Sequence, residues 1–156
     1  MLSRLSAKSD NPQDREFSNH VCVDASVWVR FLTKEPASRA VDPYFENWSN
    51  QCSFFMAPSL LIFEVVSGLR KKCKAGYLSV SKAKEILEGF YEYPILLYQS
   101  EELLNLTIDF AERLDMILPY DAVYLALAAW KKVPFYTADV ALYEKGKALY
   151  PDCLLV

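Results

Sequence analysis

The amino-acid sequence predicts an α/β fold, a three-layer α/β/α sandwich on a mostly parallel, roughly five-stranded sheet. Short apolar runs rich in β-branched and aromatic residues alternate along the chain with longer stretches of helical periodicity. Most of these runs lack the polar alternation of a half-exposed strand, which is typical of parallel strands buried on both faces. The strands are expected at residues 21–23, 53–57, 94–99, 133–139 and 153–156.

Helical segments separate these strands, and their end signals agree with the pattern. They are expected at residues 26–35, 38–50, 58–75, 79–93, 100–115, 121–132 and 140–151. Pro36 stops the first helix, and the third starts at Pro58 and Ser59 and ends in lysines before Gly76. Either Ser79 or Ser81 caps the next helix. Acidic residues fill the first turn of the helix after it, where the helix dipole favours them.

The composition indicates one globular domain. The chain has 156 residues, of which 53% are hydrophobic, enough to bury a core. Residues 1–19 are polar and of mixed charge, and we expect a disordered tail there, followed by a domain over residues 20–156. The net charge is −3, so nucleic acid would have to be attracted by local positive charge or bound cations.

Cysteine usage and hydropathy predict a cytoplasmic protein without a membrane span. The four cysteines lie far apart at no metal-ligand spacing, which favours reduced thiols over a disulfide framework or a zinc site. A single histidine, His20, gives a histidine-based catalytic triad little support. The longest uncharged apolar run covers residues 122–130, well short of the roughly 20 residues that a membrane helix needs.

Two acidic residues follow predicted strands. Asp24 closes the first strand, and Asp139 follows the fourth. Ligands of open parallel sheets bind at the carboxyl ends of the strands, so both residues are expected at the same rim. The alternative for each is an ordinary cap or turn acid, which we favour for Asp139 taken alone and find equally good for Asp24.

Two further acids lie in apolar surroundings. Glu64 sits inside the helical stretch LLIFEVV, where an unpaired buried charge would cost several kcal/mol. The alternative is an arginine partner, Arg70, Arg30 or Arg39, but a functional carboxylate is the better interpretation. Asp121 precedes the apolar run of LPYDAVYLALAAW, where it either caps a helix or serves chemistry, and both roles are compatible.

Four carboxylates gathered at one rim would repel one another, which raises their pKa values and destabilises the folded protein. A hard divalent cation would relieve that repulsion, and carboxylate oxygens suit Mg²⁺ or Mn²⁺. Such ions activate water and stabilise the leaving oxygen of a phosphodiester. Lysines and Arg70 at the end of the third predicted helix offer local positive charge, although a solvated helix end is the favoured interpretation of that cluster.

The stretches VCVDASVWVRFL, APSLLIFEVVSGLRK, LPYDAVYLALA and FYTADVALYEKGK, each centred on one of these acids, resemble the motifs of PIN-domain ribonucleases. Within that family, they specifically resemble the VapC-type toxins of bacterial toxin–antitoxin pairs. The order and spacing agree over about residues 20–156, whereas the N-terminal tail departs from the pattern.

This resemblance implies a PIN-like fold and a Mg²⁺- or Mn²⁺-dependent endoribonuclease acting on RNA. Asp24, Glu64, Asp121 and Asp139 match the family's acidic quartet of catalytic and metal-binding residues, with Ser26 and Thr137 as supporting residues. Family members usually form homodimers and are inhibited by a cognate antitoxin protein. Two alternatives stay open: an RNA-processing nuclease outside a toxin–antitoxin pair, and a non-catalytic PIN-fold interaction module.

Overall fold

A computed structural model describes residues 19–34, 40–51, 53–116 and 118–156. Five parallel strands form one sheet in the order β3-β2-β1-β4-β5. The strands are β1 (His20–Val23), β2 (Phe54–Pro58), β3 (Ile95–Tyr98), β4 (Phe135–Thr137) and β5 (Cys153–Leu155). The predicted α/β fold with a parallel five-stranded sheet is therefore confirmed. The predicted tail falls on residues 1–19 and lies, apart from Asn19, outside the described residues.

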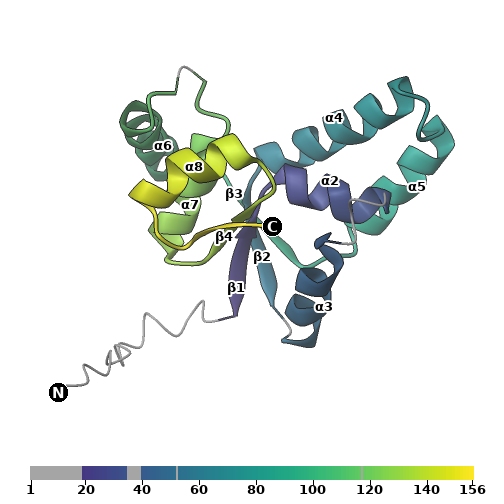
Figure 1. The fold of residues 1–156 in the computed structure, drawn as a ribbon, viewed down its shortest axis with the longest axis horizontal. Helices are drawn as coiled ribbons and strands as arrows, with labels where there is room; N and C mark the ends of the chain where they lie inside the picture. The colour runs from purple at the N-terminus through teal and green to yellow at the C-terminus, as the bar shows by residue number, and fades with distance from the viewer. Residues whose placement is uncertain (1–18, 35–39, 52, 117) are drawn as a thin grey trace.

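The helices cover both faces of the sheet. They are α2 (Ala25–Thr33), α3 (Asp42–Asn50), α4 (Leu60–Lys74), α5 (Val80–Phe90), α6 (Glu101–Arg113), α7 (Ala122–Lys131) and α8 (Val140–Leu149). Figure 1 shows α6, α7 and α8 on one side of the sheet and α2, α3 and α5 on the other. Helix α4 starts at the carboxyl end of β2 and extends along α2 and α5. No helix in the described ranges is long and apolar enough to cross a membrane.

The start of α4 differs from the sequence prediction. We expected a strand over residues 53–57 and a helix from Pro58, but β2 includes Pro58 and the helix begins at Leu60. The reason is continued pairing with the neighbouring strand. Pro58 is aligned with Tyr98 of β3, and the Ser59 N–H donates to the Tyr98 carbonyl at 3.0 Å. Strand pairing thus extends one residue further than local propensity indicates.

An aromatic cluster fills the space between the sheet and the α2 side. The indole of Trp28 in α2 is fully buried, and four rings surround it edge-on at centroid distances of 4.8–5.1 Å. These rings belong to Phe45, Phe55, Phe90 and Tyr93. Edge-to-face pairs add stabilisation beyond the buried apolar area. Phe45 and Trp48 of α3 are both buried and belong to this core.

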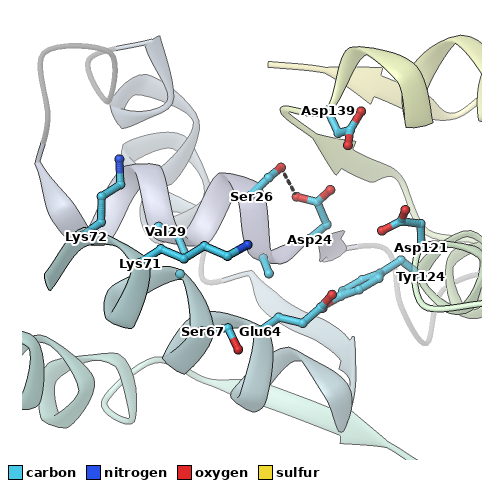
Figure 2. A pocket seen from close by; sticks show the side chains of 12 residues that line it. Asp24, Ser26, Val29, Glu64, Ser67, Lys71, Lys72, Asp121, Tyr124 and Asp139 are labelled. Carbon is cyan, nitrogen blue, oxygen red and sulfur yellow. Dashed lines mark hydrogen bonds between the residues drawn. The ribbon is translucent and has the colours of Figure 1, made fainter. Parts of the chain in front are cut away.

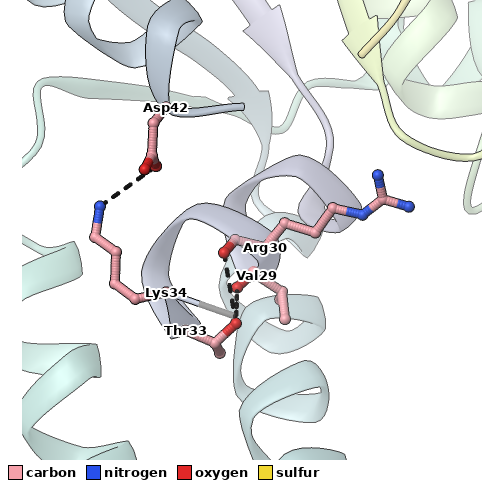
Figure 3. Close-up of polar contacts among 5 residues, drawn as sticks. All are labelled: Val29, Arg30, Thr33, Lys34 and Asp42. Carbon is pink, nitrogen blue, oxygen red and sulfur yellow. Dashed lines mark hydrogen bonds and ion pairs between the residues drawn. The ribbon is translucent and has the colours of Figure 1, made fainter. Parts of the chain in front are cut away.

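Polar contacts and a close helix crossing hold α2 against its neighbours. Lys34 follows α2 in a left-handed conformation (φ 52°), and its amine lies 3.5 Å from a carboxylate oxygen of Asp42 at the start of α3 (Figure 3). Helix α4 crosses α2 at Gly68, where an added Cβ would lie 2.5 Å from a methyl group of Val29. These contacts fix the helix whose first turn lies at the carboxyl end of β1.

Candidate functional site

The four predicted acids line one cavity at the carboxyl ends of β1 and β4. The cavity has a volume of about 530 Å³. Asp24 immediately follows β1, Glu64 lies in the second turn of α4, and Asp121 and Asp139 directly precede α7 and α8. Figure 2 shows the carboxylates of Asp24, Asp121 and Asp139 facing a common space, with Glu64 entering from the opposite wall. Four segments far apart in the sequence thus bring like charges together.

Asp24 is the most buried and most strongly held of the four, with 6% of its surface exposed. Oδ1 accepts hydrogen bonds from the Ser26 hydroxyl at 2.6 Å and from the Val27 N–H at 3.2 Å, so it caps α2. Oδ2 accepts from the Thr137 hydroxyl at 2.5 Å. Burial raises the pKa of Asp24, and these hydrogen bonds oppose that rise by stabilising the charged form.

Ser26 and Thr137, the predicted supporting residues, also join Asp24 to the turn that carries Asp139. The Ser26 hydroxyl accepts from the Ala138 N–H, and the Thr137 hydroxyl accepts from the Asp139 N–H, both at 3.0 Å. Each hydroxyl therefore donates to one carboxylate oxygen of Asp24 and accepts from the β4–α8 turn. Geometry at Asp24 and at Asp139 is coupled through these two side chains.

Asp139 combines the two interpretations that the sequence left open. Its Oδ1 accepts from the Leu142 N–H at 3.0 Å, so it is a cap of α8. The residue is nevertheless exposed and lines the cavity with the other acids. Capping uses one carboxylate oxygen and leaves the side chain at the rim. The cap interpretation that we favoured for Asp139 is correct as far as the helix is concerned, and it does not exclude the residue from the cavity.

The partner of Glu64 is a tyrosine on another helix. Among the described residues, Glu64 makes no ion pair with arginine, and Arg39 lies outside them. Instead its Oε2 accepts from the Tyr124 hydroxyl at 2.5 Å. Desolvation raises the pKa of Glu64, the tyrosine hydrogen bond lowers it, and the charges of Asp121 and Asp24 raise it further. Tyr124 was not among the site residues predicted from the sequence. It lies one turn beyond Asp121 and, as a buried tyrosine, needs a partner for its hydroxyl.

Asp121, unlike Asp24 and Asp139, makes no capping hydrogen bond in the described structure. It occupies the position before α7 with helical backbone angles. The residue is exposed. Partial burial and the charge of Asp139 raise its pKa. The capping role that the sequence allowed is therefore absent here, and both oxygens of Asp121 are available to a ligand.

Basic side chains lie on the α4 wall of the same cavity. Lys71 and Lys72 both line it, and Figure 2 shows the amine of Lys71 directed toward Asp24 and Ser26. Within the described ranges, Lys71 forms no ion pair at 4 Å or closer. The basic cluster of α4 thus includes one member that faces the acids rather than bulk solvent. The cavity can therefore hold an anionic group that contacts Lys71 on one side and, on the other side, binds to the acids through a cation.

The carboxylate oxygens of the cavity suit a hard divalent cation that takes its remaining ligands from water and substrate phosphate. All four acids offer carboxylate oxygens, which Mg²⁺ and Mn²⁺ prefer. Among the described residues, however, no three acidic, histidine or cysteine side chains are close enough to form a ready metal-binding group. Mg²⁺ typically uses one or two carboxylates and completes its shell with water and substrate phosphate, so an open set of this kind is suitable for it.

Comparisons with known proteins concern the family and the fold of the chain. The family model of the PIN domain matches residues 21–148. The crystal structure of PAE2754 from Pyrobaculum aerophilum superimposes with a TM-score of 0.61 over 88% of each chain, at 18% sequence identity. At that identity the likeness concerns the fold. No curated protein matches the sequence at a significant level.

Proposed function

The chain belongs to the PIN-domain family, whose members are generally nucleases, and from that premise we propose that it is a Mg²⁺- or Mn²⁺-dependent endoribonuclease. Its reaction is the hydrolysis of RNA phosphodiester bonds. The observation that carries the proposal is the convergence of Asp24, Glu64, Asp121 and Asp139 on one cavity. Desolvation raises the pKa values of the first three, and neighbouring carboxylates raise those of Glu64 and Asp121 further.

The charged residues of the cavity and the two hydroxyl residues bonded to Asp24 have distinct parts in this proposal. Asp24, Asp121 and Glu64 are the strongest candidates to hold the cation, with Asp139 as the fourth. When bound, the cation supplies an activated water and charge stabilisation at the phosphodiester. Ser26 and Thr137 fix the orientation of the Asp24 carboxylate. The amine of Lys71 lies on the wall where it can attract a substrate phosphate.

An RNA-cleavage assay with Mn²⁺ and product mapping tests the proposal. Wild-type protein should cleave a single-stranded RNA in Mn²⁺ and lose activity in chelator. Asp24→Asn and Asp121→Asn should abolish cleavage while the far-ultraviolet circular dichroism stays that of the wild type. Asp109→Asn, on the exposed surface of α6, is the matched control and should keep full activity. Absence of cleavage by the wild type, or full activity of both site variants, would refute the proposal.

The toxin role is the finer part of the proposal. It includes a cognate antitoxin protein as partner and a cytoplasmic location, and it is supported by the likeness of the four motifs to VapC-type toxins and by the free thiols of Cys22, Cys73 and Cys153. A short upstream reading frame for a small DNA-binding protein would distinguish a toxin from an RNA-processing nuclease. A non-catalytic module would bind neither Mg²⁺ nor Mn²⁺, so metal titration separates that alternative.

A homodimer is also part of the proposal, and exposed apolar side chains support it. Phe63 of α4 (74% exposed), Leu104 of α6 (51%) and Tyr120 before α7 (55%) surround a hollow of about 340 Å³. Contiguous exposed apolar surface of this kind commonly marks a protein interface. Light scattering should give the mass of a dimer for the wild type, and Phe63→Glu should give a monomer. A monomeric wild-type protein would remove the homodimer from the proposal.

A further inference from the structure

The hydrogen bond between Glu64 and Tyr124 joins two helices across the cavity. Glu64 lies in α4 and Tyr124 in α7, and their oxygens are 2.5 Å apart. Figure 2 shows the two side chains meeting tip to tip below the other acids. Glu64 is half-buried, whereas Tyr124 is only 1% exposed. The contact therefore joins the partly exposed side chain of Glu64 to the buried side chain of Tyr124.

Tyr124 is held firmly at its other end. Its ring stacks on Phe135 of β4 with centroids 6.1 Å apart, and its carbonyl accepts from the Cys22 thiol of β1 at 3.7 Å. Two central strands thus fix the helix turn and the ring. A tyrosine side chain has only two rotatable torsions before its hydroxyl, so a packed ring leaves the hydroxyl little freedom.

Glu64 needs such support because neighbouring charges and solvent act against a single position of its carboxylate. The charges of Asp121 and Asp24 act on it repulsively, and solvent is accessible on its exposed side. A glutamate has three side-chain torsions, and their freedom is lost when the carboxylate is held in one place. Within the described residues, the Tyr124 hydroxyl is the only side-chain donor to Glu64.

We infer that Tyr124 is a positioning residue that holds the Glu64 carboxylate at the acid cavity and thereby sets the affinity for the divalent cation. This inference rests on the proposed function, because it assigns Glu64 to the cation. Groups that orient metal ligands by hydrogen bonding typically change metal affinity by about 10- to 100-fold when they are removed. In this inference Tyr124 acts through Glu64.

Mn²⁺ titration by calorimetry of the metal-free full chain tests the inference. Tyr124→Phe keeps the buried ring and removes the hydroxyl, and its dissociation constant for Mn²⁺ should rise about tenfold. Tyr150→Phe is the matched control, because the Tyr150 hydroxyl donates to the Val133 carbonyl at 2.8 Å, at a position that does not line the cavity. Its dissociation constant should equal that of the wild type.

Glu64→Asp provides a second variant that leaves the buried ring untouched. Shortening the side chain by one methylene keeps the charge and withdraws the carboxylate from Tyr124. Mn²⁺ affinity should fall, and adding Tyr124→Phe to this background should weaken binding no further. An equal effect of Tyr124→Phe in both backgrounds would show that the tyrosine does not act through Glu64, which overturns the inference.

The outcomes separate this inference from the proposed function. If the wild type binds Mn²⁺ and cleaves RNA while Tyr124→Phe binds Mn²⁺ as tightly as the wild type, the inference fails and the proposed function stands. If the wild type neither binds Mn²⁺ nor cleaves RNA, the proposed function fails and the role of Tyr124 fails with it. Weaker Mn²⁺ binding by Tyr124→Phe, with Tyr150→Phe unchanged, supports the inference even before any rate is measured.

Discussion

Thr137→Val measures how strongly hydroxyl donors hold Asp24. Thr137 is fully buried, and valine has nearly its shape, so the main change is loss of the hydroxyl. That hydroxyl donates to Asp24 at 2.5 Å and accepts from the Asp139 N–H at 3.0 Å. A hydrogen bond to a charged group contributes about 1.5–3 kcal/mol and a neutral one about 0.5–1.5 kcal/mol. The free energy of unfolding should therefore fall by about 2–4.5 kcal/mol near neutral pH.

The cost of Thr137→Val should depend on pH, because its larger part belongs to the ionised form of Asp24. In the folded wild type the pKa of Asp24 lies above its ordinary value of 3.8. The folded state thus binds the proton more tightly, and stability falls as pH rises from that value through the raised pKa. Loss of a hydrogen bond that favours the carboxylate raises the folded pKa further. As pH increases through the pKa of Asp24, the variant should therefore lose more stability than the wild type does.

Urea unfolding of metal-free protein, followed by circular dichroism at about pH 8 and about pH 4.5, measures both effects. Thr107→Val is the matched control, because Thr107 is also a buried threonine but its hydroxyl donates to the uncharged carbonyl of Leu103 at 2.7 Å. Its cost should be smaller and independent of pH. The reasoning is refuted if the two valine variants lose equal stability, or if the cost of Thr137→Val is the same at both pH values.

Three further predictions concern the charges and the packing around the cavity. Asp121→Asn should raise the melting temperature of metal-free protein and remove the stabilisation by Mn²⁺, whereas Asp109→Asn should change neither in a thermal scan. Lys71→Gln should weaken RNA binding in a filter-binding assay and lower its salt dependence by about one ion. Gly68→Ala should cost about 1–3 kcal/mol in urea unfolding because its methyl group meets α2, whereas Gly89→Ala, with open space around it, should gain about 0.5–1 kcal/mol.

The fold could be predicted because the three inner strands of the sheet, β1, β2 and β4, are mostly buried. Each strand reads as a short apolar run, and each connection carries a helical pattern, so the alternation itself indicates parallel crossovers. The ends of the helices and strands were harder to predict from the sequence. The β2–α4 boundary depends on hydrogen bonding between Ser59 and Tyr98, residues 39 positions apart. Local propensity contains no information on a partner at that separation.

The acidic residues of the candidate site could be predicted from the sequence, but the partner of Glu64 could not. A carboxylate inside an apolar stretch, such as Glu64, stands out because burial of an unpaired charge is costly. An arginine is the partner that the sequence suggests, since opposite charge is the usual compensation, but the structure supplies the neutral hydroxyl of Tyr124 instead. A tyrosine within an apolar helix is expected to belong to the core. Tyr124 does so, but its hydroxyl reaches the cavity and donates to Glu64.

The four carboxylates differ in how much of their hydrogen-bonding capacity the protein already uses, and this difference assigns them unequal parts. A carboxylate has about four lone-pair positions. Asp24 gives at least three of them to Ser26, Val27 and Thr137, so its orientation is fixed before any ligand arrives. Asp121 gives none to a capping bond, so in the proposed function it is free to adapt to a cation, at the cost of repulsion from Asp139 when no cation is bound. In the proposed function, a rigid ligand together with an adaptable one suits a cation that also accepts water and phosphate.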